Sequence, residues 1–222
     1  KKYRPIVIIH LAAKSEVNEK ISQKHYIKNN IEATKRLILN LNNLKLNNLI
    51  FASTAALYKN ISKNLKEDTP KKLDNNYAKT KFICEKLIRK NLKSFIILRF
   101  FNVCSALQIR NRLFGELHNP ENHLMPTVIT KALFDKKVKV FGNNFNTPDR
   151  TAIRDYIHVK DICIAVEKSI KLLLKKNNRS IFNLGTGKGY SIKDIINETS
   201  KYLKKKILFD YSPRRKGDKN KL

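Results

Sequence analysis

Three apolar runs in the first half of the chain are short and nearly uninterrupted, at residues 6–13, 49–54 and 95–102. Between them, residues 24–44 and 76–90 place apolar side chains at helical spacing. Continuous apolar runs of this length are typical of strands that are buried on both faces of a parallel sheet. The alternation of strands and helices predicts an α/β fold, and right-handed crossovers would make it a doubly wound Rossmann-type sheet.

The pattern changes after residue 103, where a polar loop is expected over 105–122. We therefore divide the chain into residues 1–103, which carry the Rossmann-type alternation, and residues 104–222, a smaller mixed α/β lobe. The elements expected after the loop are helices over 123–135, 160–174 and 191–203, the last capped by Ser191, and strands over 137–141, 153–159 and 182–184.

The formal charge of +29 is large for 222 residues, and it would suit a nucleic-acid or acidic-membrane partner. However, Lys far outnumbers Arg, and Asn and Ile are also abundant, which is what an AT-rich coding bias produces. The lysines are spread over all segments, with no basic motif interleaved with aromatic residues. A nucleic-acid partner is therefore not favoured, although the positive field would help to gather anionic substrates.

The three cysteines, Cys84, Cys104 and Cys163, are isolated and lie in apolar segments. This favours buried, reduced thiols and a cytoplasmic protein. No CxxC or paired His and Cys spacing suggests a metal, and His118 is among the histidines that have no evident partner for one. The apolar runs are far shorter than a membrane span, so no membrane partner is expected.

Tyr77 and Lys81 lie four residues apart in the segment NNYAKTKFICEKL, so they face the same side of a helix. A nearby ammonium favours the phenolate, so Lys81 would lower the pKa of Tyr77 toward working pH. Such a tyrosine can take a proton from an alcohol while a cofactor takes the hydride. The pair thus indicates a reaction that composition alone does not.

The same spacing also occurs at Tyr156 in YIHVK and at Tyr202 in YLKKK. Only Tyr77 opens an amphipathic helix after an apolar strand that ends in Ser53 and Thr54. Tyr156 lies in a strand-like run, and Tyr202 lies on a lysine-rich face that solvent should cover. We therefore favour Tyr77.

Several segments occur in the order found in a known family: FASTAALY, NNYAKTK, LRFFNV, NHLMP, TPDRTAIRDYIHVKDI, FNLGTGKGYSI and PRRKGD. On these motifs the chain resembles the extended short-chain dehydrogenases/reductases, the NAD-dependent epimerase/dehydratase family, and most closely its UDP-hexose epimerases. The related 4,6-dehydratases carry an Asp-Glu pair after the threonine, whereas Ala55 and Ala56 follow Thr54 here.

The resemblance also implies that the chain enters the fold at the fourth strand, without the family's Gly-rich turn, and stops before its final segment. Residues 1–103 would then be a partial NAD-binding Rossmann domain, and residues 104–222 mainly the UDP-sugar-binding lobe, with returning Rossmann elements near 154–185. That turn is where the cofactor pyrophosphate meets a helix N-terminus. The GTGKG segment at Gly185 to Gly189 has a different spacing, and we interpret it as a structural turn. Leu222 falls at about the wall position that tunes acceptance of an N-acetyl group.

The implied reaction interconverts UDP-glucose and UDP-galactose at C4 through a transient 4-keto sugar, with NAD bound throughout. In it Tyr77 is the acid–base group, Lys81 holds the nicotinamide ribose and keeps Tyr77 acidic, and Thr54 holds the 4-oxygen. The implied cofactor contacts are Leu11, Ala12, Ala13, Asn30, Ser53, Tyr77, Lys81 and Phe100. His10 precedes them, and we interpret it as a satisfied core histidine.

The substrate residues that the resemblance implies are Asn102, Asn122, His123, Leu124, Phe141, Arg154, Arg215 and Asp218. Arg154 and Arg215 would grip the UDP diphosphate, since a guanidinium can donate two hydrogen bonds to phosphate oxygens. Phe141 would stack on uracil. Family members are often homodimers, and the helices near 24–44 and 76–92 are the candidates for that interface.

Two other readings stay open within this resemblance. One is a 4-epimerase for UDP-N-acetylhexosamines or UDP-pentoses. The other is an inactive homologue that only binds a nucleotide sugar. Against inactivity stands the joint presence of Thr54, Tyr77 and Lys81 with Asn102, Arg154 and Arg215. A nucleic-acid-binding protein is a third reading with little support.

Overall fold

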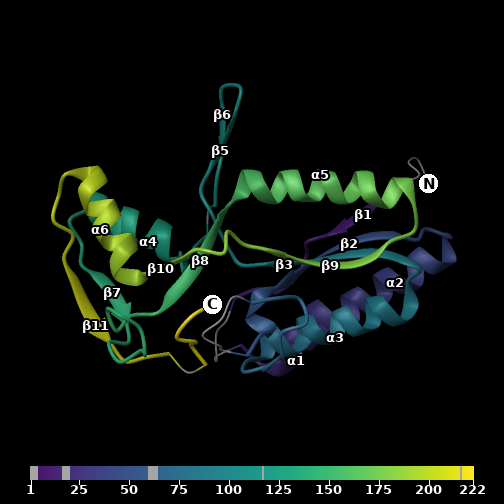
Figure 1. Cartoon of the computed structure of the whole chain (residues 1–222), viewed down its shortest axis with the longest axis horizontal. Helices are drawn as coiled ribbons and strands as arrows, with labels where there is room; N and C mark the ends of the chain where they lie inside the picture. Colours follow the sequence, from purple (N-terminus) through teal and green to yellow (C-terminus); the bar gives the residue numbers. More distant parts are fainter. Residues whose placement is uncertain (1–4, 17–20, 60–64, 117, 216) are drawn as a thin grey trace. The chain divides into compact units, whose positions relative to one another are not determined.

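The computed structural model describes residues 5–16, 21–59, 65–116, 118–215 and 217–222. It separates into two compact units (Figure 1). Unit 1 comprises residues 1–59, 63–101 and 161–184, and unit 2 comprises residues 60–62, 102–160 and 185–222. Of the segment 154–185, residues 161–184 therefore belong to unit 1 and the others to unit 2.

Unit 1 is built on a sheet of four parallel strands in the order β1, β2, β3, β9. The strands are β1 (Ile8–His10), β2 (Asn48–Thr54), β3 (Ser94–Phe100) and β9 (Arg179–Leu184). In register, Thr54 lies opposite Phe100, and Phe100 lies opposite Leu184. The carboxyl ends of these strands therefore meet at one edge of the sheet.

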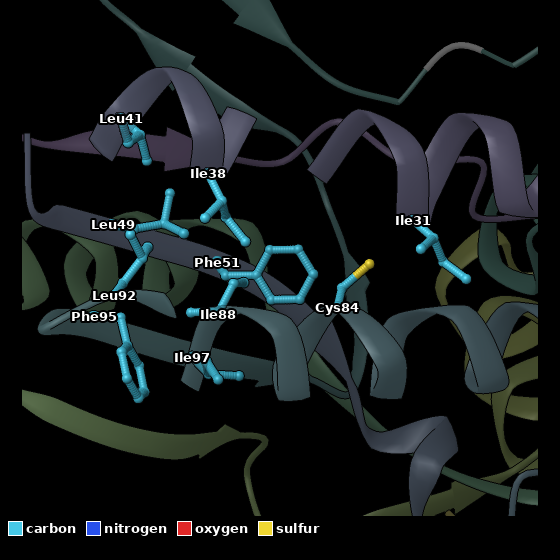
Figure 2. Close-up of a cluster of buried hydrophobic side chains, with 10 residues drawn as sticks. All are labelled: Ile31, Ile38, Leu41, Leu49, Phe51, Cys84, Ile88, Leu92, Phe95 and Ile97. Carbon is cyan, nitrogen blue, oxygen red and sulfur yellow. The ribbon is translucent and has the colours of Figure 1, made fainter. Parts of the chain in front are cut away.

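Helices cover both faces of this sheet, which confirms the predicted Rossmann-type α/β fold (Figure 1). On one face, Leu49, Phe51, Phe95 and Ile97 pack with residues of α2 and α3 (Figure 2). On the other face, the alternate residues Ile50, Ile96 and Leu98 pack against α5. Both sets are apolar because side chains alternate along a strand and each face is buried.

The helices of this unit are α1 (Gln23–Tyr26), α2 (Ala33–Asn43), α3 (Asn76–Asn91), the π-helical stretch η1 (Ile27–Glu32) between α1 and α2, the short η2 (Ala55–Leu57), and all but the first two residues of α5 (Val159–Lys175).

One expectation for this unit is wrong. The run 6–13 was predicted as a strand buried on both faces, but β1 covers only Ile8–His10. In the described part of the chain β1 is an edge strand paired with β2 alone. Ile9 is 41% and Leu11 61% exposed as a result. An apolar run shows that a strand can be buried, but the neighbouring elements decide whether it is.

Unit 2 has a mixed architecture, as predicted for the smaller lobe. Strand β8 (Ile153–His158) pairs in parallel with β4 (Asn102–Cys104) and antiparallel with β10 (Gly189–Ser191). A separate parallel pair joins β7 (Val138–Phe141) to β11 (Phe209–Ser212). Helices α4 (Leu124–Leu133) and α6 (Ile192–Leu203) pack on a core that includes Val128, Val138, Val140 and Ile196. Ser191 caps α6 as expected and forms a capping box with Asp194.

Two further expectations need correction. The predicted loop 105–122 contains an antiparallel hairpin, β5 (Leu107–Ile109) with β6 (Arg112–Phe114), whose apolar residues are too few and too exposed to signal burial. The cysteines are free, but only Cys84 is buried, and Cys163 is exposed because it lies on the outward side of the amphipathic helix α5. No helix in the described ranges has the length and apolarity that crossing a bilayer would require.

Candidate active site

Tyr77 and Lys81 lie on one side of α3, one turn apart. The helix begins after Asn75, whose side chain accepts a hydrogen bond from the backbone N–H of Ala78 at 2.8 Å. Asparagine is among the strongest N-cap residues because its side-chain oxygen satisfies a free N–H of the first turn. This cap places Tyr77 in the first turn and Lys81 at the next, deeper one.

Thr54 ends β2, at the carboxyl edge of the sheet. Its backbone is extended, and its hydroxyl oxygen accepts a hydrogen bond from the N–H of Ala56 at 3.1 Å, which fixes the start of η2. A side-chain hydrogen bond also joins Thr54 to Tyr77. Unit 1 thus brings together the predicted Thr54, Tyr77 and Lys81.

The pKa of Tyr77 is raised rather than lowered. Burial raises it to about 12, and the hydrogen bond with Thr54 offsets this only in part. The expected lowering by Lys81 is therefore wrong for this structure, in which burial penalises the phenolate and Lys81 is not among the groups that shift this pKa. At neutral pH the phenol is therefore protonated in this structure, and accepting a proton would require its pKa to fall when the ligands bind.

Lys81 is a buried cation, 2% exposed, whose ammonium lies 4.1 Å from the centroid of the Phe51 ring. Burial lowers its pKa from 10.5 to about 8, against the opposing effects of Cys84 and Glu85. Among the described residues it forms no ion pair with a carboxylate. A buried ammonium over an aromatic ring retains donors for a ligand hydroxyl.

The other two matches to the spacing have different surroundings. Tyr202 is 88% exposed, as its lysine-rich context predicted. Tyr156 lies in β8, in unit 2, where burial raises its pKa to about 12. Within the described residues, only Tyr77 is joined to a strand-end hydroxyl at the edge of the unit 1 sheet.

A buried polar network behind this site was missed at the sequence level. Arg99 and Glu85 form a bidentate pair, from Nε to Oε1 at 2.9 Å and from one terminal nitrogen to Oε2 at 2.7 Å. The Ser53 hydroxyl donates to Glu85 Oε1 at 2.6 Å, and Arg99 also donates to the Tyr58 hydroxyl at 2.8 Å. Ser53, expected to contact the cofactor, thus anchors the strand next to Thr54. No local pattern in the sequence marks this network, because it joins a helix to two strands.

The other expected cofactor contacts lie at or near the carboxyl edge of the sheet. His10 is a satisfied core histidine as predicted, since its Nε2 is hydrogen-bonded to Thr34 Oγ1 at 3.0 Å. Burial first and Lys81 second lower its pKa to about 4. Leu11 and Ala12 follow β1 and are exposed, while Ala13 and Phe100 are partly buried.

Asn30 is buried at the π-helical stretch, and its amide holds the segment after β1. Its Oδ1 accepts from the N–H of Lys14 at 2.7 Å, and its Nδ2 donates to the Lys14 carbonyl at 3.2 Å and to Thr80 Oγ1 at 3.0 Å. The residues present fit a dinucleotide. Ligands of doubly wound sheets bind outside the carboxyl ends of the strands, and here that edge carries the small Ala12 and Ala13 and the buried ammonium of Lys81.

In unit 2, four of the predicted substrate residues form one cluster. Arg154 donates to the carbonyls of Ile153 and Lys219, both at 2.9 Å, and its other terminal nitrogen lies 3.5 Å from Asp218 Oδ1. Arg215 stacks on Phe141, with 4.1 Å between the guanidinium carbon and the ring centroid. Burial lowers the pKa of Arg154, which Asp218 opposes and Arg215 reinforces. The cluster has more positive than negative charge, so it suits an anion.

Asn102 lies in β4, opposite Tyr156 of the strand that carries Arg154, but its side chain is hydrogen-bonded within the protein. Its Nδ2 donates to the carbonyl of Asp155 at 3.1 Å. The Asp155 carboxylate accepts from the N–H and hydroxyl of Thr186 at 2.9 and 2.8 Å, and from the N–H of Gly187 at 2.7 Å. Gly187 has φ of +77°, which favours glycine. Asp155 therefore holds the GTGKG segment in place, in keeping with the structural turn expected there.

The remaining three predicted residues lie at the start of α4. Leu124 packs against the core of unit 2, while Asn122 and His123 are exposed. The N–H groups of both Asn122 and His123 donate to Glu121 Oε1, each at 2.7 Å. The structure also brings His118 and Glu116 to His123, although no partner was evident for His118 in the sequence.

Comparison with known proteins identifies the relatives of this chain. The model of the NAD dependent epimerase/dehydratase family matches residues 1–185. The UDP-glucose 4-epimerase of Lactobacillus helveticus is 35% identical over 97% of this chain and 67% of its own length. The crystal structure of the UDP-glucose 4-epimerase from Brucella ovis in complex with NAD is 32% identical with a TM-score of 0.90, covering 100% of this chain and 70% of that one.

A third relative is the UDP-glucose 4-epimerase of Bifidobacterium longum, whose structure is in complex with NAD⁺ and UDP. It is 28% identical with a TM-score of 0.90, covering 99% of this chain and 68% of that one. The chain thus spans about two thirds of the length of the relatives it matches. The predicted cofactor, NAD, and the predicted epimerase class are confirmed at the level of the family. This chain belongs to the NAD dependent epimerase/dehydratase family.

Proposed function

We propose that the chain is a UDP-sugar 4-epimerase that interconverts UDP-glucose and UDP-galactose. The observation that carries this proposal is the joining of Thr54 and Tyr77 at the strand edge of unit 1, with the buried Lys81 one turn along α3. The relatives named UDP-glucose 4-epimerase support the substrate class.

Proton transfer at the sugar 4-oxygen is the task of Tyr77, and Thr54 orients that oxygen through its hydroxyl. When bound, NAD would supply the hydride acceptor for C4 of the sugar. For this, Tyr77 would have to be a phenolate that accepts the proton of the 4-hydroxyl and then returns it to the same oxygen, so that no proton is gained or lost overall. Lys81 would hold the cofactor ribose and supply the positive charge that a phenolate at Tyr77 needs.

The diphosphate of the substrate would be bound by Arg154 and Arg215, and the uracil by Phe141. Two guanidinium groups with one carboxylate, Asp218, leave a net positive charge where a diphosphate carries negative charge. Arg215 already stacks on Phe141, so uracil would have to share or replace that stacking.

The first experiment measures conversion of UDP-galactose by the 222-residue chain with NAD added. Tyr77→Phe is expected to cut turnover by about 10² or more, the usual contribution of a positioned acid–base group, with UDP affinity unchanged. Tyr202→Phe is the matched control, since Tyr202 has the same spacing to a lysine but is 88% exposed. Retained turnover in the Tyr77 variant would rule out its role.

Two alternatives are resolved in the same assay. The UDP-Glc/GlcNAc 4-epimerase of Campylobacter jejuni is 32% identical with a TM-score of 0.74, which favours testing the N-acetyl analogue of UDP-galactose. Leu222, the expected wall position, is held beside β8 by backbone hydrogen bonds to Ile153 and Asp155 at 3.0 and 2.8 Å. Binding of UDP and NAD without turnover of any UDP-sugar would instead identify a nucleotide-sugar-binding homologue.

The homodimer stays a prediction. The helices expected at its interface each expose an apolar residue, Leu39 on α2 and Ile83 on α3.

A further inference from the structure

Four metal-ligating side chains gather in the segment that leads into α4. Glu116, His118, Glu121 and His123 each offer one ligand atom, and these atoms all lie within 4.8 Å of one another. The proposed epimerase reaction uses neither carboxylate and does not use His118. We propose that these four residues form a site for a divalent transition metal ion such as Zn²⁺.

The donor atoms already lie at near-ligand spacing. Glu116 Oε1 contacts the Nδ1 atoms of both histidines, at 2.9 Å for His118 and closer for His123. His123 Nδ1 also lies 3.2 Å from Glu121 Oε1. Four tetrahedral ligands at about 2 Å from zinc are roughly 3.4 Å apart, so small side-chain rotations would close the set around an ion.

Donor geometry favours an ion over a plain cluster of ion pairs. The Nδ1 atoms of both histidines converge on the single oxygen Glu116 Oε1, and the two ring centroids lie 4.9 Å apart at side chains that are more than half exposed. Exposed ion pairs give little stability. A divalent ion would instead be neutralised by the two carboxylates and would use all four donors.

The backbone leaves these side chains available. His123 occupies the N-cap position of α4, yet its side chain makes no capping hydrogen bond. Within the described ranges, the ion pairs of Glu116 and Glu121 are all with these two histidines, although the chain carries 47 lysines and arginines. Imidazole and carboxylate ligands in a two-plus-two set are typical of zinc and related ions. The ion would tie residue 116 to the first turn of α4.

The test is calorimetric titration of the full chain with ZnCl₂, which should give one ion per chain. His118→Ala and Glu116→Gln should each weaken the affinity by about 10-fold or more, since each removes a ligand from a small set. Both residues are exposed, so the variants should fold, and unfolding curves without metal check this. His25→Ala is the matched control, because His25 is an exposed histidine outside the cluster.

The cysteines are the main competitor for zinc. Co²⁺ in place of Zn²⁺ distinguishes them, since thiolate ligation adds an intense charge-transfer band that nitrogen and oxygen ligands lack. Cys163→Ser should leave the affinity unchanged. Hydrogen exchange should slow at the amides of 118–123 only when metal is present. Binding that survives both cluster variants, that is lost in Cys163→Ser, or that does not reach one ion per chain would overturn the proposal.

Discussion

Replacing Glu85 by Gln should lower the free energy of unfolding strongly, although the two side chains have nearly the same shape. The Glu85 and Arg99 side chains are 1% and 3% exposed, and they share two hydrogen bonds. The substitution keeps the volume but leaves the guanidinium charge buried without its counter-charge. Breaking a buried pair in this way costs about 3–5 kcal/mol, because the remaining ion has lost its water and its partner.

The structure places this cost near the upper end of that range. Glu85 also accepts a hydrogen bond from Ser53, and the neutral amide of the variant would have to turn an NH₂ group toward one of these donors. The assay is urea unfolding followed by circular dichroism, read as the free energy of unfolding. Glu167→Gln is the control, since Glu167 forms an exposed pair with Lys171 one turn along α5, and no resolvable loss is expected there.

A second variant separates the lost charge from lost packing. Combining Glu85→Leu with Arg99→Met removes both charges, so it should lose less stability than Glu85→Gln alone. The reasoning fails if Glu85→Gln unfolds at the same urea concentration as the wild type. It also fails if the double replacement is the less stable of the two, since that would assign the cost to shape and hydrogen bonding rather than to an unpaired charge.

Two further predictions concern Lys81 and Ser191. Burial lowers the pKa of Lys81 from 10.5 to about 8, so the unfolded chain binds the extra proton between these values and stability rises with pH there. Lys81→Met should therefore be the more stable by up to about 3 kcal/mol at pH 7 and lose this advantage by pH 10.5, measured as the difference in unfolding free energy. Lys86→Met, at an exposed position of the same helix, should show no such pH dependence. Ser191→Ala removes the cap of α6 and should cost about 1 kcal/mol in urea unfolding, and an unchanged midpoint would contradict the capping role.

The sheet of unit 1 could be predicted because its strands carry the signal themselves. Leu49, Ile50 and Phe51 are all apolar, and consecutive apolar residues in a strand require cover on both faces. The same argument overestimated the length and burial of the first strand, since the cover over Ile9 depends on elements far away in the sequence. Hairpin β5–β6 was missed because its exposed apolar residues resemble a loop.

The candidate site was predictable where one element holds it. Tyr77 and Lys81 share a helix, so spacing alone puts them on one side. The pKa of Tyr77 was not predictable, because it depends on how deeply the finished fold buries the phenol. The pairing of Glu85 with Arg99 joins a helix to a strand, and no local pattern marks it. The partners of His118 are local instead, since Glu116, Glu121 and His123 lie within five residues of it, and paired His and Cys spacing does not reveal a set that includes carboxylates.

The way the chain crosses between its two units limits how such a protein can be divided. Residues 161–184 return to unit 1 after the excursion through 102–160, and they supply both β9 and most of α5. A gene truncated after codon 101 would therefore encode a sheet that lacks α5 and β9. Leu98 would lose its packing partners on one face, and β3 would become an edge strand. Exchanging either unit between homologues would therefore require crossovers at more than one point in the gene.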